Sequence, residues 1–143
     1  MVYKVKHEEA KIVLKNTIPK RITTFLWGRV GIGKSYLVRD IAQEIAKEQY
    51  PDRKFVIWTN TTSEEKQEII DNNEKYYTFN DIRLSEYDSS DIKGLPMFLD
   101  NKKSIEFKIP NWALLSQKPN SAGLLFFDEI NLATPIVQAS CYK

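Results

Sequence analysis

A glycine-rich octapeptide constrains this 143-residue chain more than any other feature. The segment Gly28-Arg29-Val30-Gly31-Ile32-Gly33-Lys34-Ser35 has the spacing G-x-x-x-x-G-K-S, and it lies between an apolar run and an amphipathic pattern typical of a helix. Glycines let a backbone wrap closely around an anion through dihedral angles that are closed to other residues. A helix that starts at Lys34 adds the positive end of its dipole. The segment therefore predicts a phosphate-binding loop, and a glycine-rich turn that binds nothing is the alternative.

Two side chains of this segment suit a triphosphate with its metal ion. Lys34 can place its ammonium between the β- and γ-phosphates, and for this reason we count it with the catalytic candidates. Ser35 can offer its hydroxyl to magnesium, which bridges the same phosphates. The residues predicted to contact the nucleotide are Gly28, Arg29, Val30, Gly31, Ile32, Gly33, Lys34, Ser35 and Tyr36.

A second informative motif is an apolar run that ends in two carboxylates, Leu124-Leu125-Phe126-Phe127-Asp128-Glu129. Asp128 is predicted to hold magnesium opposite Ser35, and Glu129 to orient and deprotonate the attacking water as a general base. Neighbouring residues of a strand point to opposite sides, so the strand must end at or near Asp128 if both acids serve one site. A pair of solvated acids at a strand end is the alternative.

Composition excludes several other kinds of site. The chain has one histidine, His7, and one cysteine, Cys141, so a Ser-His-Asp triad, a disulfide framework and a cysteine-rich zinc site are all disfavoured. The formal net charge is +2, which is too small to indicate nucleic acid from bulk attraction. No run approaches the ~20 apolar residues of a membrane span, so we expect a soluble cytoplasmic protein with no membrane partner.

Apolar patterns predict strands and helices in alternation. We expect strands over 22–27, 55–58, 81–84, 104–109 and 124–127, and helices over 8–16, 34–48, 62–73, 110–115 and from 134 onward, with a loop over 87–96. Thr62 and Glu65 have the spacing of a capping box. Such alternation indicates an α/β fold with a mostly parallel sheet, in which 22–27 and 124–127 are buried strands. Ligands of such sheets lie beyond the carboxyl ends of the strands, where both motifs fall.

Several segments together resemble the AAA+ ATPases, and within them the MoxR-like or dynein-related branch. They are Trp27–Ser35, Asp81–Tyr87, Asp91–Pro96, Trp112–Ala113, Leu125–Ala133, Pro135 and Val137–Ala139. The glycine loop and the acidic strand end, called Walker A and Walker B, identify only P-loop NTPases. The segments R-L-S, D-x-K-G-L-P and D-E-I-N-x-A carry the resemblance to the branch.

The resemblance implies a three-layer α/β/α P-loop NTPase fold, with the strand before the loop in the middle of the sheet. It also implies ATP and Mg²⁺ as ligands, ATP hydrolysis, and a homo-oligomeric ring that remodels or assembles client proteins. Such ATPases continue for another ~100 residues or more. We therefore expect residues 1–143 to form the first part of one AAA+ core domain, without sensor residues, arginine finger or lid. Nothing indicates the client.

Two other functions stay open. A chain without an arginine finger, which is worth ~10³ to 10⁵ in rate, could be a nucleotide-binding or assembly module without useful turnover. A P-loop kinase or other transferase is the second alternative, and Glu129 and the R-L-S segment count against it. Trp27 and Trp112 are predicted to be core residues rather than platforms for adenine. Lys102 and Lys103 are more simply solvated charges on a hairpin than contacts in a ring pore.

Overall fold

The predicted alternation of helices and strands is present in the computed structural model, which describes residues 4–98 and 104–141. The helices are α1 (His7–Thr17), α2 (Lys34–Gln49), α3 (Ser63–Asp71), α4 (Ser89–Lys93), α5 (Asn111–Gln117) and α6 (Pro135–Cys141). The strands are β1 (Lys54–Ile57), β2 (Tyr76–Arg83), β3 (Leu95–Phe98), β4 (Ile105–Lys108) and β5 (Ala122–Asp128). Short 3₁₀ turns are η1 (Ile18–Lys20), η2 (Trp58–Asn60), η3 (Asn73–Lys75) and η4 (Leu84–Glu86). Lys102 and Lys103 lie outside the described residues.

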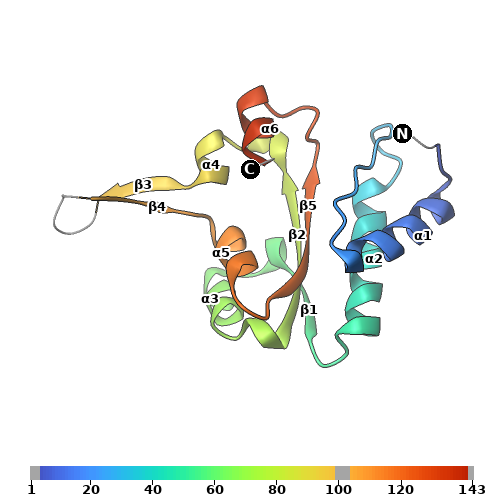
Figure 1. Cartoon of the computed structure of the whole chain (residues 1–143), viewed down its shortest axis with the longest axis horizontal. Helices are drawn as coiled ribbons and strands as arrows, with labels where there is room; N and C mark the ends of the chain where they lie inside the picture. The colour runs from blue at the N-terminus through green and yellow to red at the C-terminus, as the bar shows by residue number, and fades with distance from the viewer. Residues whose placement is uncertain (1–3, 99–103, 142–143) are drawn as a thin grey trace.

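A parallel sheet in the order β1-β2-β5 forms the centre of the molecule (Figure 1). Its longest pairing joins β2 to β5 and runs from Tyr77 opposite Ala122 to Arg83 opposite Asp128. The two strands approach closely at Gly123, where an added Cβ atom would clash with the carbonyl oxygen of Thr78. A side chain at this position would therefore force the pair apart.

Helices cover both faces of the sheet, as a three-layer α/β/α arrangement requires (Figure 1). On one face α2 packs against Tyr77 and Phe79 of β2, and α1 packs on the far side of α2. On the opposite face α3 and α5 enclose Trp58, while α6 packs over Ile82. These separate clusters follow from β2 itself, because successive side chains of a strand point to opposite faces.

The prediction of a buried strand over 22–27 is wrong. This segment has no strand structure, and Ile22, Phe25 and Trp27 are exposed, so the prediction that Trp27 is a core residue is also wrong. The physical reason is that none of the described strands pairs with this segment, so its backbone does not form the hydrogen bonds of a sheet. Leu26 alone reaches the core beside α2. The expectation that the strand before the glycine loop occupies the middle of the sheet fails with it.

Other boundaries differ in ways that pairing and packing explain. The strand predicted over 81–84 begins at Tyr76, because the aromatic residues before it are part of the same strand. Within the described sheet β5 is an edge strand that pairs only with β2, and its residues are half-buried or exposed, so the prediction of a buried strand over 124–127 is wrong. The loop predicted over 87–96 contains α4, and Leu95 begins strand β3, which pairs with the predicted strand β4 in an exposed hairpin.

Several predicted elements are confirmed. The helix predicted over 34–48 is α2, and Thr62 caps α3 in a reciprocal capping box with Glu65. Trp112 packs between the two clusters on the α5 face, in agreement with its prediction as a core residue. None of the helices in residues 4–98 and 104–141 has the length and apolar content that a membrane crossing requires.

The packing of α2 against the sheet gives a stability prediction. Ile41 is completely buried, so Ile41→Ala should lower the free energy of unfolding by roughly 2–5 kcal/mol through lost burial and a residual cavity. Ile12, which is 62% exposed on α1, provides the matched control. Ile12→Ala deletes the same side-chain atoms as Ile41→Ala, but at a position where they are already in contact with solvent. Urea unfolding of both variants measures the difference, and equal losses would contradict the assigned core.

Candidate functional site

The glycine loop leads directly into α2. Gly33 precedes the first residue of the helix with a φ of 85°, and Gly31 has a φ of 82°, so both adopt the left-handed conformation that favours glycine. Leu37 donates its N–H to the carbonyl of Gly33, which leaves the N–H groups of Lys34, Ser35 and Tyr36 free of helical partners. The loop therefore offers backbone donors at the positive end of a helix dipole, the combination that suits an anion.

Lys34 contacts the loop itself. Its ammonium donates to the carbonyl oxygens of Gly28 and Arg29, each at 3.0 Å. Both contacts lie within the octapeptide, so the cation stays at the position where a bound phosphate would need it. A phosphate oxygen would compete with these two carbonyls for the same donor hydrogens.

Ser35 and Asp128 meet although 93 positions separate them in the sequence. The hydroxyl of Ser35 donates to Oδ2 of Asp128 at 2.6 Å, which joins the first turn of α2 to the end of β5. The other carboxylate oxygen, Oδ1, accepts the N–H of Glu129 at 2.9 Å. Hydroxyl and carboxylate oxygens are the ligands that Mg²⁺ prefers, and Mg²⁺ with phosphates needs only one or two carboxylates. These two residues therefore fit such an ion.

Asp128 ends β5, as the sharing of one site by two adjacent acids requires. Glu129 leaves the strand with a φ of 55°, a left-handed conformation that is uncommon outside glycine. Strained backbone of this kind is concentrated at functional sites. Its carboxylate accepts a hydrogen bond from the hydroxyl of Ser85 at 2.6 Å.

Ser85 was not predicted to belong to the site. It follows the end of β2 by two residues, and the pairing of Arg83 with Asp128 brings it beside Glu129. The sequence contains the Arg83-Leu84-Ser85 segment, but only the register between β2 and β5 reveals what its serine contacts. The missing signal was therefore the strand pairing, which local patterns do not specify.

Asp81 is a second residue that the sequence analysis did not place in the site. It shares the α2 face of β2 with Tyr77 and Phe79, and the same face of the sheet carries Asp128. Burial raises the pKa of Asp81, the charge of Asp128 raises it further, and the guanidinium groups of Arg83 and Arg39 lower it. One of its carboxylate oxygens is buried without a hydrogen-bond partner.

The remaining predicted nucleotide contacts lie on an open surface. Val30 is 90% exposed, Ile32 and Tyr36 are exposed as well, and the ring of Tyr36 lies 5.2 Å from the guanidinium carbon of Arg39. Within the described residues no group of three or more His, Cys, Asp or Glu side chains could hold a metal ion. An ion at Ser35 and Asp128 would accordingly draw its other ligands from a bound phosphate and water.

Comparison with known proteins gives one match. A family model described as "P-loop containing dynein motor region" matches residues 1–83, more than half of the chain. No curated protein and no solved structure matches the chain. The matched range contains the glycine loop, α2 and Asp81, whereas Ser85, Asp128 and Glu129 lie beyond it.

The raised pKa of Asp81 gives a stability prediction with a defined sign. In the pH window between its unfolded value and its raised folded value, the folded state holds more protons, so stability falls as pH rises. Asp81→Asn removes a buried charge opposed by Asp128, and it should raise the melting temperature at neutral pH by a few degrees.

The gain should shrink in acidic buffer, where the wild-type carboxyl is already protonated. Asp52→Asn, at an exposed position, is the control and should change little at either pH. Differential scanning calorimetry at both pH values makes the measurement. A gain for Asp81→Asn that is independent of pH would contradict the assigned cause.

Proposed function

The chain belongs to the family of P-loop containing dynein motor regions, within the AAA+ proteins, and from this premise we propose that it binds ATP with Mg²⁺ and hydrolyses it. The observation that carries the proposal is the 2.6 Å contact between Ser35 and Asp128, which brings the glycine loop and the acidic strand end into one site. This contact supports a shared site over the alternative of a separate glycine-rich turn and a solvated pair of acids.

The phosphate end of the nucleotide is assigned to the loop and the start of α2. Backbone N–H groups from Gly31 to Ser35 would donate to the β-phosphate, and the ammonium of Lys34 would exchange its two carbonyl partners for phosphate oxygens. The hydroxyl of Ser35 and the carboxylate of Asp128 would hold the metal ion. Bound magnesium supplies positive charge that neutralises the phosphate oxygens as the terminal bond breaks.

Glu129 is proposed as the general base. Its carboxylate lies one residue beyond the metal-binding Asp128, and the left-handed backbone at Glu129 turns it away from the strand direction. The hydroxyl of Ser85 donates to Oε2, which leaves Oε1 to orient water and accept its proton. Ser85 is thus a positioning residue, since it acts through Glu129.

One observation favours a second candidate function, nucleotide binding without useful turnover. The hydroxyl of Ser85 already occupies Oε2 of Glu129, so only one oxygen of the carboxylate that should accept a proton from water is left to contact it. A chain held in this arrangement would bind ATP and release it unchanged. The two candidates differ only in measured hydrolysis.

Finer assignments extend the proposal. The MoxR-like branch is supported by the R-L-S, D-x-K-G-L-P and D-E-I-N-x-A segments, all of which end beyond the matched family range. Members of this branch are expected to assemble as homo-oligomeric rings that remodel or assemble client proteins. A cytoplasmic location stays a prediction, and so does the assignment of residues 1–143 to the first part of one AAA+ core domain.

Lys34→Ala tests nucleotide binding. The substitution removes the ammonium that donates to the carbonyl oxygens of Gly28 and Arg29. Affinity for Mg·ATP should therefore fall at least about tenfold, which corresponds to the loss of one charge-assisted hydrogen bond. Lys47→Ala, at the exposed end of the same helix, should bind normally. Isothermal titration calorimetry measures both, and equal affinities would remove the phosphate site from this loop.

Glu129→Gln tests hydrolysis separately from binding. The amide cannot accept a proton, so the turnover rate should fall roughly 10²- to 10⁴-fold while the affinity for ATP is retained. Glu74→Gln, on an exposed turn, provides the matched control. A phosphate-release assay gives the rate. If the unmodified chain binds ATP but releases no phosphate, the second candidate function replaces the first.

A further inference from the structure

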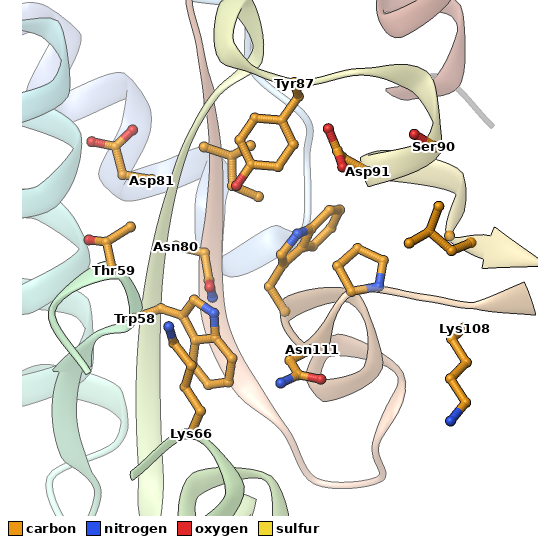
Figure 2. A pocket seen from close by; sticks show the side chains of 15 residues that line it. Trp58, Thr59, Lys66, Asn80, Asp81, Tyr87, Ser90, Asp91, Lys108 and Asn111 are labelled. Carbon is orange, nitrogen blue, oxygen red and sulfur yellow. The ribbon is translucent and has the colours of Figure 1, made fainter. Parts of the chain in front are cut away.

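A cavity of about 500 Å³ lies on the face of β2 opposite α2 (Figure 2). Its walls come from η2, α3, β2, α4 and α5, and they do not include the glycine loop. The volume falls within the range of sites that enclose small ligands. None of the residues assigned above to phosphate, metal or water lines it.

Three residues of the cavity wall carry a buried polar atom without a hydrogen-bond partner. They are Asn80 (Oδ1), whose residue is only 6% exposed, Trp112 (Nε1) and Asp81 (Oδ1). Figure 2 shows Asn80 directed to the cavity side of β2, whereas Asp81 points to the opposite side. An unpaired buried donor or acceptor costs about 1–3 kcal/mol, so one of each around a single cavity indicates a ligand that satisfies both.

Aromatic and cationic groups complete the wall. Trp58 is 6% exposed, and Nζ of Lys66 lies 5.8 Å from its ring centroid. Lys108 lines the cavity from the hairpin side. Asp91, an acid of the wall, already accepts the N–H of Asp88 at 2.7 Å within a helix cap.

We propose that this cavity binds a nucleobase, with adenine as the best-fitting member. Adenine has an amino donor and ring-nitrogen acceptors along one edge, which complement the carboxamide of Asn80 and the indole N–H of Trp112. The indole rings of Trp58 and Trp112 contribute apolar surface to the cavity wall, which suits a flat ring. Lys66 and Lys108 would meet a phosphate attached to the sugar.

The proposed base site is independent of the phosphate site of the proposed function. Asn80 and Asp81 are neighbours on one strand, so the sheet itself separates the cavity from the face that carries Ser35 and Asp128. The base could come from a free nucleotide or from an unstacked position in a single-stranded nucleic acid. Both sources share the chemistry described here.

The test uses adenosine, which has no phosphate to engage the glycine loop. Calorimetric titration of the full chain should detect binding, and Asn80→Leu and Trp112→Phe should each weaken it roughly tenfold or more, the usual effect of losing a specific base contact. Asn16→Leu, at an exposed site on α1, is the matched control and should bind normally. Lys34→Ala should also bind adenosine normally.

Thermal unfolding keeps the result interpretable. Trp112→Phe deletes an unpartnered N–H but also removes packed ring atoms, so binding is measured well below the melting temperature of each variant. No adenosine binding to the unmodified chain, or equal binding by Asn80→Leu, overturns the proposal and leaves ordered water as the occupant.

A ten-nucleotide strand of deoxyadenylate identifies the source of the base. Binding tighter than that of adenosine, with affinity that falls steeply as salt rises, supports a single strand as the natural ligand. Equal or weaker binding of the strand supports a free nucleotide or nucleoside. In both cases Asn80→Leu should bind the oligonucleotide more weakly than the unmodified chain does. An oligonucleotide that binds this variant equally well contacts another surface, and this result contradicts the proposal.

Discussion

The alternation of side chains along β2 is the constraint on which the rest of the structure depends. Tyr77, Phe79 and Asp81 point to the face covered by α2, and Asn80 and Ile82 point to the other. One strand therefore supplies a core to each layer, and it places a polar group, Asp81 or Asn80, on each face. Because β2 also pairs with β5 over seven residues, its register fixes where Asp128 and Glu129 emerge.

The parts of this arrangement that the sequence predicted are those governed by local chemistry. The helix from Lys34 has six buried apolar positions on one face, so its period alone identifies it. The glycine loop and the acidic strand end were identifiable from local patterns: a G-x-x-x-x-G-K-S spacing before a helix, and an apolar run that ends in two carboxylates. Their meeting through Ser35 and Asp128 followed from the general rule that ligands of such sheets lie beyond the strand ends.

The parts that failed depend on partners distant in the sequence. Residues 22–27 have the composition of a strand, but the described sheet offers them no neighbour. Ser85 contacts Glu129 only because two strands pair in one register, and Asn80 faces a cavity only because α3 and α5 enclose it. A strand with apolar residues on both faces can accommodate one polar residue without disturbing its pattern, so nothing local distinguished Asn80 from a core position.

The edge position of β5 has a consequence for its backbone dynamics. The N–H groups of a parallel strand point alternately to its two neighbours, and among the described strands β5 has only β2 beside it. In deuterated solvent, amides of β5 that face β2 should exchange slowly, and the intervening ones quickly, whereas β2 should be protected on both sides. Deuterium uptake along the strand that ends at Asp128 would thus alternate from one residue to the next, which would identify β5 as the edge of the sheet.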